Sequence, residues 1–255
     1  MPNELLLLVS LLVSFFGLIV FFRLAGRAGL YGWTVFVTIS ANIEVMALIR
    51  AFGMEQTLGN TLFAASFLTT DILSEIYGKR ASNRAVVIGI ATNITFILLT
   101  MTWMLYTPSA QDWALPSIRT IFSNTPRMML ASLVAYAVSQ AHDVWAYHTW
   151  WKLTTKWFGD SRKCLWVRNN GSTLVSQLIN TVLFTLLAFW GTYGFATLSS
   201  IFWSSYLIFI ITSLLDTPFV YLARWMYHTR MVRPGKRVAE ADQDETAEEA
   251  NGNGN

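Results

Sequence analysis

The chain has 255 residues, of which 54% are hydrophobic and 13% are charged, and its formal net charge is +3. Soluble domains carry about 25% charged residues, so this composition excludes an ordinary soluble protein and predicts an all-α, polytopic helical membrane protein. No basic stripe is interleaved with aromatic residues, which argues against a nucleic-acid partner. The single Cys164 excludes an intramolecular disulfide framework and a CxxC metal site. No cofactor is expected.

Seven apolar stretches follow one another, most of them near the ~20 residues that cross a bilayer. They are approximately Leu5–Phe22, Leu30–Ile49, Thr57–Ile76, Ala85–Tyr106, Arg127–Thr149, Ser172–Tyr193 and Ser200–Tyr227. The first is preceded by Glu4 and by no basic residue, which favours a retained transmembrane helix over a signal peptide. An uncleaved signal anchor remains the alternative. The last contains Pro218 and is expected to be tilted or kinked.

The distribution of basic residues predicts the orientation of these spans. With the N-terminus outside, fourteen Lys and Arg residues fall on the inner side and three on the outer side, which predicts an N-out, C-in protein. Three regions are expected: 1–29 with the first helix and the first inner loop, a six-helix core over 30–232, and an acidic disordered tail over 233–255. The segment Trp150–Trp166 fits an interfacial helix and a polar loop equally well.

Five carboxylates fall within the apolar stretches, where charged groups are costly and indicate function. They are Glu44, Asp71, Glu75, Asp143 and Asp216. Each also has a structural interpretation. Glu44 could pair with Arg50, and Asp71 and Glu75 could end their helix at the interface. Asp143 could pair with His142 or with a basic residue of the next loop, and Asp216 could bind backbone groups freed by Pro218.

The orientation places several polar residues at similar depth in the inner half of the membrane. Thr173, Gln177 and Asn180 share one helix face by their spacing, and Asp71 and Asp143 lie at a comparable level on other spans. This pattern predicts a polar cavity shared between helices, with polar contacts between helices as the alternative. A carboxylate can accept two N–H groups from a guanine-like edge, and amides can pair with its carbonyl, so a planar heterocycle fits such a cavity.

Two blocks carry a resemblance to a known family. Phe67–Gly78 reads FLTTDILSEIYG and Arg168–Gln177 reads RNNGSTLVSQ. Together they closely resemble the queuosine precursor transporter family, also called the VUT or YhhQ-type family, and Asn42 and Asp143 fit its pattern. The resemblance spans roughly Trp33 to Tyr221. The chain departs from the family at two positions, where many members carry an acid and a lysine, namely Asn180 and Ile208.

The resemblance implies an importer of 7-deazaguanine compounds, the 7-cyano and 7-aminomethyl precursors of queuosine, in a bacterial inner membrane. It also implies six core helices, so the first predicted helix would be an additional one. The leading hypothesis is alternating access through the inner-half cavity, without a catalytic or metal site. Substrate-binding candidates are Asn42, Asp71, Asp143, Thr173, Gln177 and Asn180. Gating or supporting candidates are Glu75, Arg168, Asn170 and Asp216.

Other functions are weighed against this hypothesis. A transporter for another nucleobase or a vitamin-like heterocycle is the first alternative. An intramembrane enzyme lacks support, because the chain has three histidines, no HExxH motif and no nucleophile elbow. A seven-helix receptor is the remaining alternative. A retinal protein would need a lysine in the last span, which has none, and the inner-half polar residues are poorly placed for a ligand from outside. The expected partners are the lipid bilayer and a small molecule. Proton coupling through Asp71 or Glu75 and assembly into a homo-oligomer are left open.

Overall fold

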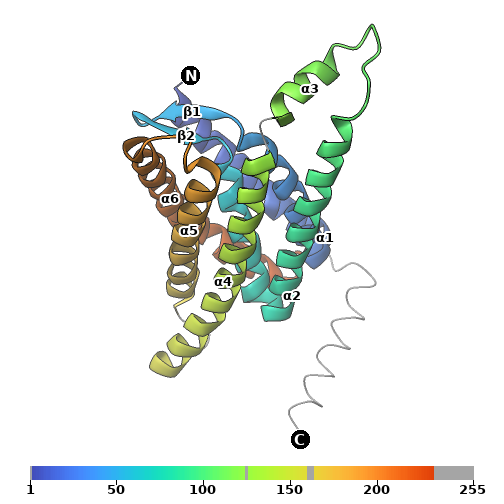
Figure 1. Cartoon of the computed structure of the whole chain (residues 1–255). Coiled ribbons are helices and arrows are strands. Elements are labelled where there is room, and N and C mark those ends of the chain that lie inside the picture. Colours follow the sequence, from blue (N-terminus) through green and yellow to red (C-terminus); the bar gives the residue numbers. More distant parts are fainter. Residues whose placement is uncertain (1, 124–125, 160–163, 233–255) are drawn as a thin grey trace, which may run out of the picture.

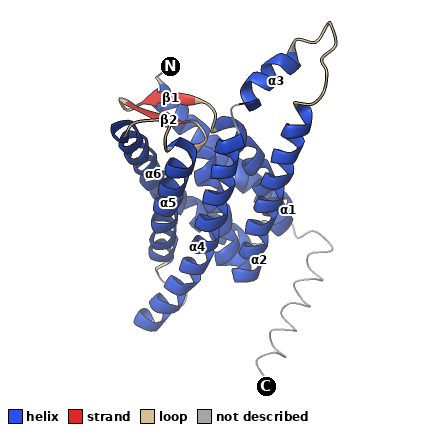
Figure 2. Cartoon of the chain, in the orientation of Figure 1, coloured by secondary structure: helices blue, strands red, loops and turns tan. Residues whose placement is uncertain are grey.

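The computed structural model describes residues 2–123, 126–159 and 164–232. The described residues form six helices and one antiparallel hairpin (Figures 1 and 2). The elements are α1 (Asn3–Glu44), β1 (Leu48–Ala51), β2 (Met54–Thr57), α2 (Asn60–Trp103), α3 (Ala114–Ser123), α4 (Pro126–Phe158), α5 (Leu165–Phe189) and α6 (Phe195–His228). The prediction of a helical membrane protein is confirmed, whereas the predicted acidic tail lies outside the described residues.

Helix α1 folds back on itself at Gly26. A straight helix of its 42 residues would be about 63 Å long. Instead, both of its ends lie at the β hairpin. The Asn3 side-chain amide donates to the carbonyl of Arg50 at 2.8 Å, and the Glu4 carboxylate accepts from the backbone N–H of Phe52 at 2.8 Å. Gly26 has φ 55° and ψ −130°, which breaks the helix into two antiparallel arms.

Helix α2 makes the same kind of reversal at Gly78, where φ is 79° and ψ is 179°. The Ser82 hydroxyl donates to the carbonyl of Thr70 at 2.9 Å. These residues are twelve positions apart and would be separated by about 18 Å along a straight helix. Each of the two longest helices therefore contributes two arms to the bundle, in agreement with the separate apolar stretches of the sequence.

The hairpin of β1 and β2 lies at one end of the bundle (Figure 1). Its two turn residues, Phe52 and Gly53, have φ of 53° and 74°, the pair of positive values that a tight two-residue hairpin turn requires. The Ser204 hydroxyl of α6 donates to the carbonyl of Glu55 at 2.9 Å and holds the hairpin to the bundle. The predicted spans 30–49 and 57–76 were wrong at these ends, because Leu48 and Ile49 belong to β1 and Thr57 belongs to β2.

Among the residues that the structure describes, four helices are long and apolar enough to cross a membrane by length and composition: α1, α2, α5 and α6. Helix α4 covers the predicted stretch 127–149 but is not among them. It also continues as a helix to Phe158, which resolves the first part of the ambiguous segment 150–166. The short helix α3 was not predicted. It begins after Asp112, whose carboxylate accepts from the backbone N–H groups of Ala114 and Leu115.

The outer surface of the bundle is apolar, as contact with lipid requires. Val13, Leu24 and Val87 are each more than 60% exposed. Inside, one apolar cluster joins both arms of α1 to α2 and α6, with Phe15 and Leu68 fully buried in it. The first arm of α1 thus packs on the same core as the later helices. The proposed boundary between 1–29 and 30–232 stays a prediction.

The reversal at Gly78 yields a test of the fold. Its backbone lies in a region that only glycine occupies readily, and nothing lies within 4 Å of a Cβ added there. Gly78→Ala should therefore destabilise the protein through backbone strain alone, by about 1–3 kcal/mol. We expect a lower thermal unfolding midpoint for the detergent-purified variant. Gly32→Ala is the matched control, since its nearest neighbour would be 4.0 Å away. Equal midpoints for the two variants would contradict the assignment.

Candidate functional site

Helix α5 buries a polar face. Ten of its thirteen buried residues are polar, while large apolar side chains such as Val175 and Leu186 are exposed. This is the reverse of a helix on the surface of a soluble protein. The buried polar residues are Arg168, Asn169, Asn170, Ser172, Thr173, Ser176, Gln177, Asn180, Thr181 and Thr185. Helix α5 therefore supplies one polar wall in the interior of the bundle.

Three carboxylates from three other helices meet this wall. Asp71 of α2, Asp143 of α4 and Asp216 of α6 are each no more than 1% exposed, and Asp71 interacts electrostatically with both of the others. We call these three residues the carboxylate cluster. The Thr173 hydroxyl donates to Asp71 Oδ2 at 3.0 Å, and the Asn169 amide donates to Asp216 Oδ1 at 2.9 Å. No basic side chain of the described ranges forms an ion pair with the cluster.

Several polar atoms at and beside the cluster have no hydrogen-bond partner. Within the described residues these are Asp71 Oδ1, both carboxylate oxygens of Asp143, Asn169 Oδ1 and both amide atoms of Gln177. A buried polar group left without a partner costs about 1–3 kcal/mol. Most buried polar groups in folded proteins do have partners, so a set of this size indicates a place where a ligand, a proton or water completes the bonding.

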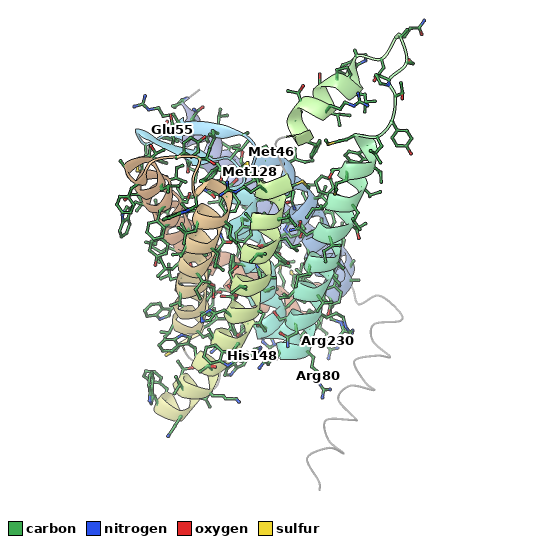
Figure 3. All side chains as sticks on the ribbon, in the orientation of Figure 1. Met46, Glu55, Arg80, Met128, His148 and Arg230 are labelled. Atoms are coloured by element: carbon green, nitrogen blue, oxygen red, sulfur yellow. The ribbon has the colours of Figure 1, made fainter. Side chains whose placement is uncertain are left out.

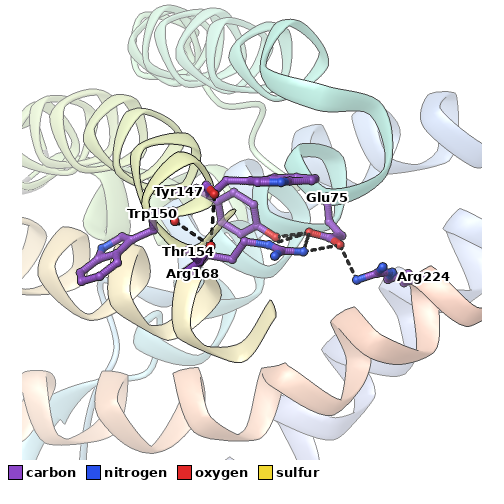
Figure 4. A network of polar contacts seen from close by, with 7 residues as sticks. Glu75, Tyr147, Trp150, Thr154, Arg168 and Arg224 are labelled. Carbon is purple, nitrogen blue, oxygen red and sulfur yellow. Dashed lines mark hydrogen bonds and ion pairs between the residues drawn. The ribbon is translucent and has the colours of Figure 1, made fainter. Parts of the chain in front are cut away.

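A second group of residues forms an ion-pair network around Glu75 (Figure 4). Arg168 Nη2 lies 2.7 Å from each Glu75 carboxylate oxygen, and Arg224 Nη1 lies 2.8 Å from Oε1. The Tyr147 hydroxyl donates to Oε2 at 2.8 Å. The guanidinium of Arg168 also lies 4.3 Å from the centre of the Trp151 ring. We call Glu75, Tyr147, Arg168 and Arg224 the Glu75 network; it ties α2, α4, α5 and α6 together.

The network corrects two expectations. Arg168 was placed in an inner loop, but it is the fourth residue of α5 and is fully buried. Glu75 precedes the Gly78 reversal by three residues, yet its side chain is only 3% exposed, so it is not a solvated helix end. The two residues therefore form a buried ion pair with each other.

The supporting candidate Asn170 joins α5 to α6 near Pro218. Its amide donates to the Thr217 hydroxyl at 2.8 Å, and its carbonyl oxygen accepts from the Ser213 hydroxyl at 3.1 Å. Asp216 was expected to bind backbone groups beside the proline. The bond that the structure shows is to the side chain of Asn169 instead. This contact fixes the position of Asp216 relative to α5.

The remaining candidates lie apart from the carboxylate cluster. The Asn42 amide donates to the carbonyl of Thr38 in its own helix at 2.7 Å. Asn180 lines a cavity of about 30 Å³ together with Asn60 and Phe63, which is room for a water molecule. Asn60 binds the Ser205 hydroxyl near the hairpin end. Among the described residues, neither Asn42 nor Asn180 forms a hydrogen bond with Asp71, so the structure does not bring all six substrate-binding candidates together.

Two expected pairs are also absent from the described residues. Arg50 lies opposite Glu55 in the hairpin and does not form an ion pair with Glu44. His142 Nδ1 lies 2.9 Å from the Ser176 hydroxyl rather than against Asp143. Sequence reasoning missed three residues that matter here. Asn169, in the second sequence block, was quoted without a role, and Tyr147 and Arg224 gave no signal because both sit near predicted helix ends.

Comparison with known proteins gives one consistent answer. A model of the family described as "Putative vitamin uptake transporter" matches residues 57–223, a range that holds the carboxylate cluster. A "Probable queuosine precursor transporter" of Bacillus subtilis (strain 168) is 36% identical over 215 residues, covering 84% of this chain and 92% of the relative. A "Queuosine precursor transporter" of Escherichia coli (strain K12) is 25% identical over 154 residues, covering 60% and 64%. No solved structure matches significantly.

The Glu75 network predicts a pattern of stabilities. Glu75→Ala leaves the buried Arg168 guanidinium without its carboxylate, which should destabilise the protein by about 3–5 kcal/mol. Adding Arg168→Met removes that uncompensated charge, so the double variant should recover part of the loss. Thermal unfolding of the purified proteins measures both. A double variant less stable than Glu75→Ala alone would show that Arg168 is held by other contacts.

Proposed function

Because the chain belongs to the family that comprises vitamin uptake and queuosine precursor transporters, we propose that it imports the 7-cyano and 7-aminomethyl 7-deazaguanines across a bacterial cytoplasmic membrane. It is a membrane transporter and not an enzyme. The observation that carries the substrate proposal is the set of buried, unpaired polar atoms on Asp71, Asp143 and Gln177. Their chemistry complements the hydrogen-bonding edge of a guanine-like base.

The membrane topology proposed for this function has seven crossings, with the N-terminus outside. The two arms of α1, the two arms of α2 and the helices α4, α5 and α6 would supply them. One observation supports this orientation. Arg80 and Arg230 lie at the end of the bundle opposite the hairpin (Figure 3). Basic residues gather on the cytoplasmic side of membrane proteins, so the hairpin end would face outward.

Recognition would centre on Asp143. Both of its carboxylate oxygens are unpaired, so they can accept N1–H and N2–H of a 7-deazaguanine together. The amide of Gln177 can donate to O6 of the same edge. Asp71 keeps one free oxygen, because Thr173 already donates to the other. Asp143, rather than Asp71, is therefore the main contact to the ring in this proposal.

Charge offers a way to bind the aminomethyl precursor. Its ammonium group would meet a cluster of three carboxylates without a cationic partner, whereas the cyano precursor is neutral. Guanine presents the same N1–H, N2–H and O6 edge, so another nucleobase remains the second candidate. A binding panel of both precursors, queuine and guanine separates the two, because a preference among them must arise at the 7-position.

Alternating access would require the Glu75 network to open. Glu75 lies fifteen residues along its arm from Asn60, so it is about 22 Å from the hairpin end. Through Arg168 and Arg224 it ties α2 to α5, which lines the carboxylate cluster, and to α6, which holds Asp216 of the cluster. In the proposed orientation this closes the cytoplasmic side. Release of substrate inward would break these ion pairs, and their re-formation would return the site to the outside.

The substrate site can be tested by uptake. In cells that lack their own transporter, Asp143→Asn should lower uptake of labelled 7-cyano-7-deazaguanine about 10- to 100-fold, because bonds to a buried charged group contribute about 1.5–3 kcal/mol. Gln177→Ala should give a smaller loss. Glu44→Gln is the matched control, a carboxylate at the end of α1 outside the cluster. Unchanged uptake in Asp143→Asn at equal protein level would refute the assigned site.

A further inference from the structure

Asp71 and Asp143 approach one another beside α5, where the nearby hydroxyl groups already have acceptors. Thr173 donates to Asp71 Oδ2, and Ser172 and Ser176 donate to backbone carbonyls of α5. The two carboxylates are close enough to share a hydrogen bond, yet both Asp143 oxygens and Asp71 Oδ1 are without a donor. Two ionised carboxylates cannot bond to each other. A single proton on one of them would create an O–H···O bond and remove the repulsion between two like charges. On α5, the side-chain oxygen Asn169 Oδ1 also has no hydrogen-bond donor.

The charged and titratable groups around Asp71 supply no cation to it. On α4 it faces Asp143 and Tyr147, and on α6 it faces Asp216. On its own helix Glu75 lies one turn away. On α5, Arg168 is the nearby basic group, and it is bound to Glu75. The charges that surround Asp71 at close range are therefore mostly negative.

The same contacts exclude Glu75 as the proton carrier. Its two oxygens are bound by Arg168 and Arg224 and accept from Tyr147. A proton on Glu75 would have to displace one of these donors, whereas Asp71 Oδ1 has no donor to displace. Asp71 and Glu75, which share a helix face, thus have opposite electrostatic surroundings, and this difference separates two residues that the sequence alone left as equal candidates.

We propose that Asp71 and Asp143 bind one proton between them, and that this proton crosses the membrane with each precursor molecule. The inference rests on the proposed function above and makes the protein a proton symporter. The proton enters from the outer solution and forms an O–H bond on Asp71. That group donates to Asp143, which stays ionised and accepts N1–H and N2–H of the base. Opening of the Glu75 network releases the base and the proton together to the cytoplasm.

Coupling follows from charge balance. Without the proton, an ionised Asp71 repels the ionised form of Asp143 that the base requires. With the proton, Asp71 both neutralises one charge and orients the other carboxylate. Proton and base therefore bind more tightly together than alone, which is the condition for symport. Asp216 already has a donor in Asn169, so the proton is assigned to the Asp71 and Asp143 pair, whose free oxygens have none.

The test uses the full-length protein in proteoliposomes with the neutral 7-cyano precursor, so that the proton is the one ion moved. Counterflow without an ion gradient measures transport itself. An inward pH gradient of one unit should support up to about a tenfold accumulation for one proton per molecule. Asp71→Asn should lose this accumulation. Its counterflow, lowered by the loss of a cluster contact, should no longer depend on pH, whereas a merely weaker binding site would keep the pH dependence. The control Glu44→Gln should keep both.

Infrared spectroscopy of the purified protein adds a readout that needs no substrate. The wild type and Glu44→Gln should show the C=O stretch of a protonated carboxyl group, and Asp71→Asn should lose it. Accumulation that follows a sodium gradient, or a protonated carboxyl band that survives Asp71→Asn, would overturn the proposal. Absence of counterflow in the wild type would instead refute the proposed function, and the infrared band would still decide whether the pair holds a proton.

Discussion

The distribution of buried charge is the constraint on which this structure depends. Four carboxylates lie in the interior of the bundle, and the two arginines of α5 and α6 nearest to them both bind the same one, Glu75. An ion removed from water without a partner costs several kcal/mol, so the remaining three carboxylates must be compensated by something else. One part of the core is thus fully bonded and holds four helices together, while the adjacent part lacks donors.

The path of the backbone places these two regions next to each other. The reversals at Gly26 and Gly78 divide α1 and α2 into two antiparallel arms each, and both arms pack in the bundle. Asp71 lies along the first arm of α2, and Glu75 follows one turn later near the reversal. Helix α5 runs alongside with its polar face inward, so Arg168 meets Glu75 and Thr173 meets Asp71. The spacing of four or five residues on each helix sets both contacts.

Much of the architecture was predictable because lipid imposes simple rules on sequence. The apolar stretches, the helical class and the family followed from composition and from the two blocks around Asp71 and Arg168. The reversals were expected as separate helices, since hydropathy falls near Gly26 and Gly78. The hairpin was not predicted, because its strands have only four residues each and β2, which reads MEQT, lacks the apolar alternation of a strand. The turn at Phe52 and Gly53 carries little signal.

The site itself was only partly predictable. Residues one turn apart on a helix can be identified from spacing, which is how Thr173 and Gln177 were found. Partners from distant segments cannot, because pairing depends on how the helices are rotated about their axes. The contacts of Asn169, Tyr147 and Arg224 arise from that rotation. The same rotation explains two candidates that lie outside the carboxylate cluster. Asn180 shares a helix face with Thr173 and Gln177, and Asn42 fits the family pattern, but neither property fixes which partners a side chain meets.

The central claim is that buried carboxylates receive the N1–H and N2–H edge of the base. The most direct measurement compares the dissociation constants of purified protein for 7-cyano-7-deazaguanine and for its counterpart without the 2-amino group. Loss of one donor leaves an oxygen of Asp143 unpaired again, so the account predicts at least about tenfold weaker binding of the counterpart. Equal dissociation constants for the two compounds would contradict it.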